Sequence, residues 1–188
     1  MFIQTEATPN PATLKFLPGK VVMENGTAEF RDAEEAAAGS ALASRLFTIP
    51  GVTGVYFGYD FITVTKEDQE WQHLKPAILG SIMEHFMSGQ PVMAVQTRAE
   101  ESDLDGEFFD EGDETIVATI KELLESRVRP AVAQDGGDIT FKGFRDGVVF
   151  LNMKGACSGC PSSTATLKHG VQNLLHHFIP EVQAVEAV

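Results

Sequence analysis

The clearest hydrophobic pattern lies in the last third of the chain, where apolar residues follow a helical period, then alternate, then return to a helical period. The pattern predicts a helix, two strands, a helix and a strand over residues 116–128, 139–144, 148–153, 166–178 and 182–188. Asp146-Gly147, between the two alternating runs, is typical of a hairpin turn. The first helix should stop at Arg129-Pro130 or shortly beyond. This order of elements favours a small α/β domain with its helices on one face of a sheet.

The first 96 residues show a less regular pattern that mixes strands and helices. The pattern predicts strands over residues 2–5, 13–17, 55–57 and 61–64 and helices over residues 32–47 and 71–87. An Ala-rich composition and an Asp N-cap support the first of these helices. Because Pro76 falls in the first turns of the second, we expect that helix to start late, near Lys75, or to bend there.

The composition changes sharply across residues 97–113, where acidic residues crowd together without an apolar period. We interpret this stretch as a solvated linker between an N-terminal domain, residues 1–96, and a C-terminal domain, residues 114–188. A surface loop within one domain is the alternative, and loops of this length are uncommon inside compact folds. Phe108 and Phe109 can dock on a neighbouring surface. The expected fold class is α/β (α+β): two small domains, each a short mixed sheet with helices packed on it.

Composition and charge exclude several classes of function. The chain has 188 residues, is 43% apolar, and carries 14 Lys and Arg against 27 Asp and Glu, for a formal net charge of −13. Such a charge repels phosphate backbones and anionic lipids, so we expect neither nucleic acid nor a membrane as a partner. No apolar run approaches the roughly 18 residues of a spanning helix. The N-terminus resembles neither a signal peptide nor a mitochondrial presequence, so we expect a protein that works where it is made or has been trimmed.

The chain contains two cysteines, Cys157 and Cys160, which argues against a disulfide-stabilised secreted scaffold and favours a reducing compartment. They lie in Gly155-Ala-Cys-Ser-Gly-Cys-Pro161, where a predicted strand ends and a predicted helix begins. Two thiols at this spacing can reach one metal ion or one edge of an iron-sulfur cluster. Pro161 suits the first helical position. The dipole of the following helix predicts that both thiols are unusually acidic.

The number of thiols decides how such a site could be completed. Iron-sulfur clusters and structural zinc take four protein ligands, whereas this chain offers two cysteines. The pair therefore predicts either a symmetric dimer with the cluster on its two-fold axis or a two-ligand site completed by external thiols. A cluster held at a subunit seam is easily given away, which is the profile of a carrier and a poor one for a permanent electron-transfer centre.

Other interpretations of the same cysteines stay open. A thioredoxin-like dithiol oxidoreductase also uses a CxxC motif, but it usually carries the motif early in its domain, after the first strand of a βαβ unit. Here the motif follows a hairpin late in the chain. Inert thiols, or a single zinc ion that bridges two subunits, form the second alternative.

Titratable residues outside the CxxC motif are weaker candidates. Three histidines of the last predicted helix could complete a zinc site: His169, His176 and His177. A solvated or helix-capping role is favoured for them, since a cation is stabilised near a helix C-terminus. No ligand role is predicted for His73 and His85. Asp135 and Asp138 could form a catalytic acid pair, but the two glycines between them favour a tight turn.

Several motifs of the second half occur in a familiar order: Arg129-Pro130, Asp135-Gly-Gly-Asp138, Gly155-Ala-Cys-Ser-Gly-Cys-Pro161, Thr166-Leu167, Gly170-Val171 and Pro180-Glu-Val182. In this order they make the second half similar to the NifU C-terminal domain. The first half, with Thr8-Pro-Asn-Pro11 and Gly89-Gln-Pro-Val92, resembles the N-terminal domain of the Nfu proteins. The whole chain therefore resembles an Nfu-type iron-sulfur cluster carrier.

This resemblance implies a 4Fe-4S cluster held between two subunits through Cys157 and Cys160. The cluster-bound protein would be a homodimer that receives its cluster from an upstream donor scaffold and passes it to apo client proteins, with no chemical turnover. Nitrogen-fixation NifU proteins carry further cysteine-bearing domains that this sequence lacks, which favours delivery over de novo assembly. The mitochondrial members bear a presequence, so we expect a bacterial cytoplasmic protein, with the mitochondrial matrix as the alternative if a presequence has been removed.

Overall fold

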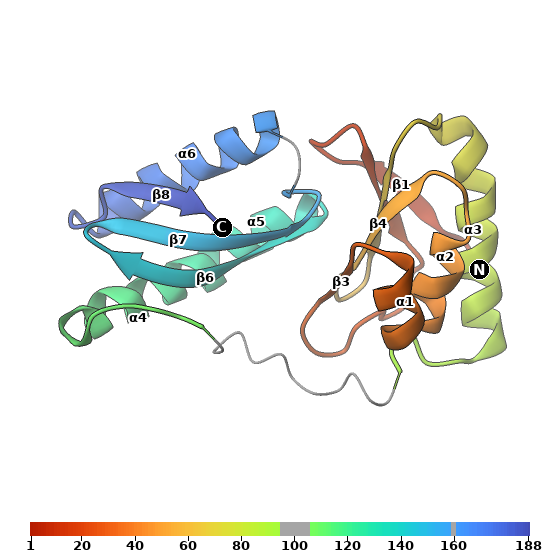
Figure 1. Cartoon of the computed structure of the whole chain (residues 1–188), viewed down its shortest axis with the longest axis horizontal. Helices are drawn as coiled ribbons and strands as arrows, with labels where there is room; N and C mark the ends of the chain where they lie inside the picture. Colours follow the sequence, from red (N-terminus) through yellow and green to blue (C-terminus); the bar gives the residue numbers. More distant parts are fainter. Residues whose placement is uncertain (95–105, 159–160) are drawn as a thin grey trace. The chain divides into compact units, whose positions relative to one another are not determined.

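The computed structural model describes residues 1–94, 106–158 and 161–188, and the chain divides into two compact units, Met1–Glu100 and Glu101–Val188 (Figure 1). Each unit is a sheet with helices packed on one face, which confirms the predicted fold class. In the described parts of the chain, no helix is both long and apolar enough to cross a membrane. Residues 97–105 of the predicted linker lie outside the described residues, so the linker stays a prediction there.

The first unit is built on an antiparallel sheet. Its strands are β1 (Gln4–Ala7), β2 (Thr13–Leu17), β3 (Ala28–Phe30), β4 (Val52–Phe57) and β5 (Ile62–Lys66). They lie in the order β1-β2-β5-β4-β3, and every neighbouring pair is antiparallel, so the mixed pairing expected of both sheets does not apply to this one. The helices on its face are α1 (Ala33–Gly39), α2 (Ala41–Phe47) and α3 (Trp71–Ser88). Strand β3 is too short for an alternating pattern to reveal it.

Two details of the predicted helices in this unit are wrong. The helix expected over residues 32–47 is interrupted at Ser40, whose backbone is extended and whose Oγ accepts the Ala43 N–H at 3.1 Å as the N-cap of α2. Gly39 ends α1 just before it, because glycine is a poor helix former. The helix expected to start late, near Lys75, or to bend there does not start late: it begins at Trp71, where the indole N–H donates to the carbonyl of Pro11 at 3.1 Å.

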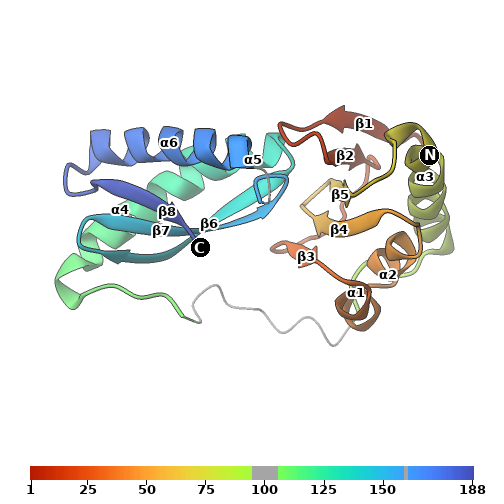
Figure 2. The ribbon, with the colours of Figure 1, turned by 45° about the horizontal axis from the view of Figure 1, so that its top comes forward.

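The second unit has a mixed sheet with helices on one face (Figure 2). Its strands are β6 (Gly137–Arg145), β7 (Val148–Gly155) and β8 (Ala184–Ala187), and its helices are α4 (Glu114–Leu123), α5 (Arg129–Gln134) and α6 (Pro161–Phe178). Strand β7 pairs antiparallel with β6 and parallel with β8. The hairpin turn is the predicted one, since Asp146 and Gly147 both have positive φ, 52° and 78°.

Helices α4 and α5 are joined without a break by a π-helical segment, η3 (Leu124–Val128). The N–H of Arg129 donates to the carbonyl of Leu124, five residues back, instead of four. Pro130 follows directly, and a proline ring inside a helix clashes with the carbonyl four residues before it. The wider turn accommodates Pro130, and the helix, predicted to stop at Arg129-Pro130 or shortly beyond, ends at Gln134.

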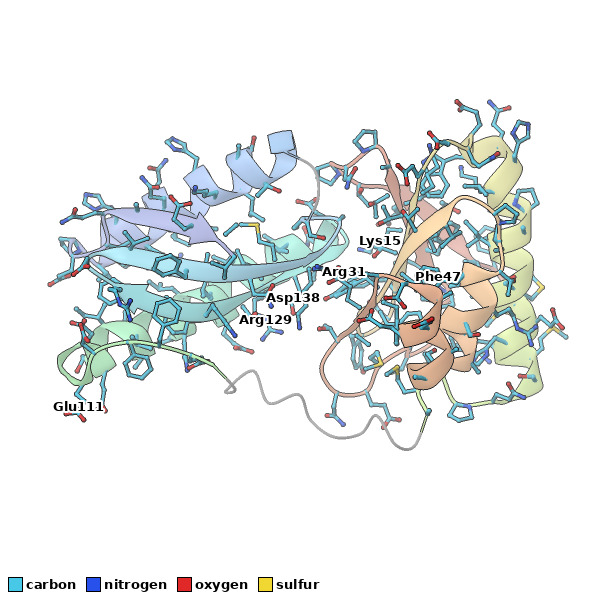
Figure 3. All side chains as sticks on the ribbon, in the orientation of Figure 1. Lys15, Arg31, Phe47, Glu111, Arg129 and Asp138 are labelled. Atoms are coloured by element: carbon cyan, nitrogen blue, oxygen red, sulfur yellow. The ribbon has the colours of Figure 1, made fainter. Side chains whose placement is uncertain are left out.

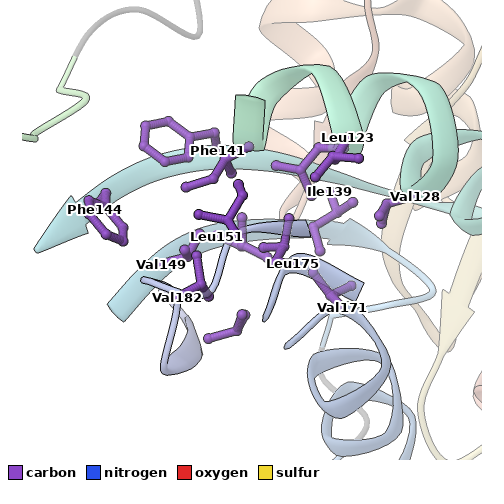
Figure 4. Packing of buried hydrophobic residues seen from close by; sticks show 14 of the residues in the cluster. Leu123, Val128, Ile139, Phe141, Phe144, Val149, Leu151, Val171, Leu175 and Val182 are labelled. Atoms are coloured by element: carbon purple, nitrogen blue, oxygen red, sulfur yellow. The ribbon is translucent and has the colours of Figure 1, made fainter. Parts of the chain in front are cut away.

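One hydrophobic core lies between the helices and the sheet of the second unit (Figure 4). Its buried members include Leu123, Val128, Ile139, Phe141, Phe144, Val149, Leu151, Val171, Leu175 and Val182. Alternate residues of β7 enter this core, as a strand covered on one face requires. The core includes the end of β7 and Cys157, two residues after it, so it holds Cys157 in place.

Part of the acidic stretch before α4 belongs to the second unit. We call Glu107 and Phe108 the strap. The Phe108 N–H donates to the Lys142 carbonyl at 3.2 Å, and the Phe144 N–H donates to the Phe108 carbonyl at 2.9 Å, so the strap pairs with the outer edge of β6. The ring of Phe108 lies over Gly143, where an added Cβ would come within 2.5 Å of ring carbons. Phe108 thus docks on a neighbouring surface, as its aromatic character indicates.

Candidate metal centre

Cys157 lies in the loop between β7 and α6, directly after the strand predicted to precede it. Cys160 and Gly159 lie outside the described residues, so the joint action of the two thiols stays a prediction. Gly155 ends β7 with a φ of 68°, a conformation that favours glycine. The side chain of Cys157 is 7% exposed and belongs to the core of the second unit.

Hydrogen bonds fix the backbone of this loop on both sides of Cys157. The N–H and the hydroxyl of Ser158 both donate to the Gly155 carbonyl, at 3.1 and 2.9 Å. The hydroxyl of Thr164, in the first turn of α6, donates to the Cys157 carbonyl at 2.9 Å. Hydrogen bonds within the chain therefore fix the position of the Cys157 backbone.

The turn between α5 and β6 forms the floor beneath the Cys157 thiol. A Cβ added to Gly137 would lie 2.6 Å from Cys157 Sγ and 2.8 Å from the Lys154 carbonyl oxygen, so a side chain does not fit there. The N–H of Ala156 donates to the Gly136 carbonyl at 3.1 Å. The turn predicted between Asp135 and Asp138 is confirmed, and it also supplies the surface against which the thiol packs. We call Gly136 and Gly137 the floor.

An ion pair between a half-buried guanidinium and a buried carboxylate lies at the end of the floor. Asp138 is 5% exposed, and its two carboxylate oxygens accept Nε and Nη2 of Arg129, each at 2.9 Å. The Ile139 N–H donates to the same carboxylate at 2.9 Å, and a third guanidinium nitrogen donates to Glu125 at 3.2 Å. The hydrogen bond to Asp138 raises the pKa of Arg129 further above its ordinary range. The Arg129 guanidinium is therefore charged beside Asp138 throughout the neutral pH range.

The prediction of an unusually acidic thiol is wrong for Cys157. Burial raises the pKa of Cys157 from 9.0 to about 12, and the negative charges of Asp135 and Asp138 add to the rise. The dipole of α6 does not compensate, because desolvation acts on the sulfur itself. In the metal-free chain Cys157 is a neutral thiol at neutral pH. The same prediction for Cys160 lies outside the described residues.

The weaker candidates do not assemble into a site. Within residues 1–94, 106–158 and 161–188, no group of three or more His, Cys, Asp or Glu could hold a metal ion. The histidines His169, His176 and His177 are exposed, and Nδ1 of His176 lies 2.7 Å from the Val182 carbonyl. Asp138 is committed to Arg129 and Asp135 is exposed, so the two do not form a catalytic acid pair.

Sequence reasoning misses Arg129 and Gly137 as contributors to the site. The signal for Gly137 is the doubled glycine: the turn needs one residue with positive φ, and Gly136 supplies it with 80°. The second glycine indicates a close approach of another chain segment. For Arg129 the signal is weaker, because nothing in the order of residues says which of the nearby acids, Glu125, Asp135 or Asp138, it contacts.

Comparison with known families assigns both halves of the chain. The family described as "Scaffold protein Nfu/NifU N terminal" matches residues 3–89. The family described as "NifU-like domain" matches residues 120–186, which include Cys157, Cys160 and the floor. Together these matches cover the two halves whose motifs resemble the same two domains.

Relatives are similar to the whole of this chain. The human protein "NFU1 iron-sulfur cluster scaffold homolog, mitochondrial" is 52% identical over 190 residues, covering 100% of this chain and 72% of its own length. "NifU-like protein 4, mitochondrial" of Arabidopsis thaliana is 51% identical over 189 residues, so this chain spans 65% of that relative. An NMR structure of a NifU-like protein from Saccharomyces cerevisiae is 27% identical, with a TM-score of 0.46, over 50% of this chain and 86% of that one. The chain belongs to the Nfu family of NifU-like proteins.

Proposed function

We propose that this protein is an iron-sulfur cluster scaffold and carrier. The observation that carries the proposal is a buried thiol, Cys157, held against a glycine floor in the half of the chain matched by the NifU-like domain. The human relative is named as an iron-sulfur cluster scaffold, which supports the same role here. Iron-sulfur clusters are held by cysteine thiolates, and glycines allow the backbone to approach cluster sulfurs closely.

Cys157 and Cys160 are the proposed ligands. A 4Fe-4S cluster takes four cysteines and one chain supplies two, so the cluster would bridge two subunits of a homodimer. The described residues offer no other cluster of ligands that could complete the site within one chain, which favours bridging. Because Cys157 is protonated when free, loading would release its proton, as metal coordination of a thiol does.

The cluster is cargo in this proposal, and the protein performs no chemical turnover on it. An upstream donor scaffold would supply the cluster, and apo iron-sulfur proteins would receive it. A cluster at a seam between subunits can leave when the subunits part. The first unit, matched by the N-terminal Nfu family, would dock clients or partners.

Dithiol oxidoreductase activity fits the site less well. Such enzymes attack with a thiolate whose pKa is lowered, whereas burial raises the pKa of Cys157 to about 12. The compartment follows the relatives rather than our first expectation: the human and Arabidopsis proteins are both named mitochondrial. A bacterial cytoplasmic location has no support among them, and we propose the mitochondrial matrix, the alternative.

The test is anaerobic reconstitution with iron and sulfide, followed by gel filtration with absorbance at 280 and 400 nm and an iron assay of the peak. We expect a coloured dimer with about four iron atoms per two chains. Cys157→Ser and Cys160→Ser should each abolish the colour. His169→Ala serves as the matched control, because this exposed residue of α6 lies outside the proposed ligand set.

Three other outcomes of this reconstitution experiment would contradict the proposal. A coloured dimer that survives Cys157→Ser would overturn the ligand assignment. A colourless protein that reduces a disulfide substrate without iron would favour the dithiol alternative. A colourless dimer that binds one zinc per two chains would reduce the site to a structural one.

A further inference from the structure

We propose that Arg129 is a positioning residue for Cys157, acting through Asp138 and the floor. The proposal rests on the proposed function, because it concerns how firmly the thiol that would hold a cluster is fixed. Among the described residues, no hydrogen bond joins Arg129 to Cys157; Arg129 instead holds the segment on which the Cys157 thiol rests. Figure 3 shows Arg129 beside Asp138, the first link of this arrangement.

The geometry of the ion pair makes it a firm anchor. Two parallel hydrogen bonds of 2.9 Å join the guanidinium to the two carboxylate oxygens, an arrangement that fixes orientation as well as distance. The side chain of Asp138 is 7% exposed, and that of Arg129 is 32% exposed. A carboxylate as buried as Asp138 needs this partner, since an unpaired charge would move toward water.

A single residue, Gly137, separates Asp138 from the thiol of Cys157. Gly137, next to Asp138, pairs with Gly155 across the β6–β7 ladder and lies directly against Cys157 Sγ. Gly136 accepts the hydrogen bond of Ala156, the residue before Cys157. A shift of Asp138 therefore moves both the surface under the thiol and the hydrogen bond that holds its backbone.

The π segment places Arg129 where it can make this contact. In η3 the turn before Arg129 spans five residues, and α5 starts at Arg129 itself. Glu125 accepts the third guanidinium nitrogen from the preceding turn, so the side chain is held from its own helix and from β6. Arg129 thus links helix α5 to the floor of the site.

The consequence concerns the retention of a cluster. Groups that orient a metal ligand without touching the metal typically change metal affinity by about 10- to 100-fold when they are removed. With Arg129 gone, the floor loses its anchor and Cys157 can leave its position. We expect Arg129→Gln to bind a cluster and lose it about tenfold faster than the unchanged protein.

The experiment compares two ion pairs of the second unit. Arg129→Gln, Arg129→Lys and Asp138→Asn alter the pair at the floor, and Lys121→Gln alters a pair of similar burial, Lys121 with Glu107, at 2.6 Å. The side chains of that control pair are 38% and 11% exposed, close to the 32% and 7% of the first. The full-length proteins are reconstituted with iron and sulfide, and cluster loss to an iron chelator is followed at 400 nm. Urea unfolding of each variant gives its stability.

We expect cluster loss to quicken about tenfold in Arg129→Gln and Asp138→Asn and to change less than twofold in Lys121→Gln. Arg129→Lys should fall between, because lysine keeps the charge without the two parallel bonds. Equal retention in Arg129→Gln and the unchanged protein would overturn the proposal. The proposal would also be overturned if Lys121→Gln lost its cluster as fast as Arg129→Gln while both variants were equally destabilised. General destabilisation of the second unit would then explain the faster loss.

A cluster-free measurement separates this proposal from the proposed function. If the unchanged protein takes up no cluster, the proposed function fails, and positioning is tested by the rate at which Cys157 reacts with a maleimide in a Cys160→Ser background. Arg129→Gln should raise that rate at a fixed pH, because the thiol is no longer held in its buried position, and Lys121→Gln should leave it unchanged. Equal rates in all three proteins would overturn the positioning role.

Discussion

The two units of this chain share an architecture, but one buried polar side chain in each lies in an opposite environment. In the second unit, Asp138 is 5% exposed and both its oxygens are bonded. In the first unit, His85 on α3 is fully buried, and neither ring nitrogen has a hydrogen-bond partner among the described residues. Burial, and then the charge of Arg45, lower the pKa of His85, and the backbone of Gln90 and Pro91 opposes this only in part.

The difference indicates how each unit should respond to a change in pH. Next to the floor, the pKa of the Arg129 guanidinium is raised, and this side chain is paired with Asp138. The first unit instead contains a buried imidazole whose protonation is opposed by desolvation and by the charge of Arg45. Acid should therefore destabilise the first unit, which we propose as the docking unit.

The largest effect we predict is on the reactivity of Cys157, and it tests the burial of its thiol. With a pKa of about 12 instead of 9.0, the thiolate fraction of Cys157 at neutral pH should be about 1,000-fold lower than that of an unperturbed thiol. In a Cys160→Ser variant without metal, the alkylation rate should still rise steeply with pH at pH 10. A plateau at or below pH 9 would show that the thiol is not desolvated.

The next effect tests the close packing of the floor. Gly137→Ala places a methyl group 2.6 Å from Cys157 Sγ and should destabilise the second unit by about 1 to 3 kcal/mol. Gly170→Ala, in the middle of α6 with nothing within 4 Å of the new Cβ, is the matched control. It should stabilise by about 0.5 to 1 kcal/mol. Urea unfolding measures both, and equal effects from the two would contradict the role of the floor.

A smaller effect tests whether the strap belongs to the second unit. The ring centroid of Phe108 lies 5.2 Å from that of Phe150, and the Arg145 guanidinium lies 5.2 Å from the Phe108 ring. Because the ring is half-buried, Phe108→Ala should cost about 1 to 2 kcal/mol, less than a core phenylalanine. The adjacent and more exposed Phe109 is the control, and Phe109→Ala should cost about 0.5 kcal/mol or less. Equal losses would place the start of the unit after the strap.

The smallest effect concerns the pH dependence of the first unit. The pKa of His85 is lowered in the folded state, so the unfolded chain binds the proton first as the pH falls below about 6.5. Stability is therefore present above this pH and is lost below it, by up to about 1.4 kcal/mol per pH unit until the folded-state pKa is reached. His85→Phe should flatten the urea-unfolding profile between pH 7 and pH 5. An unchanged slope would assign the acid sensitivity to other groups.

The sequence predicted most of the second unit because its signals are local. The Asp146-Gly147 turn and the helical period of α6 each depend on a few neighbouring residues, and both elements appear where they were expected. The π segment and the Arg129–Asp138 pair were missed, since they arise from how a proline is accommodated within a packed helix and which acid then comes into reach. Long-range contacts of this kind leave little trace in the order of residues.

The acidity of Cys157 was misjudged for a related reason. A helix dipole can be read from the position of a cysteine before a helix, whereas burial depends on the floor, which lies about twenty residues earlier in the chain. The same limit applies to Ser40, whose capping role is clear only once the helix on each side is known.

The π turn also makes the position of Arg129 depend on the number of residues in the helix before it. Deleting a single residue from Leu124–Val128 would leave an ordinary α-helical turn in place of the wider one. The ring of Pro130 would then clash with the carbonyl four residues before it, next to the residue that carries the guanidinium. The number of residues before Pro130, and not only their identity, therefore matters for the position of Arg129.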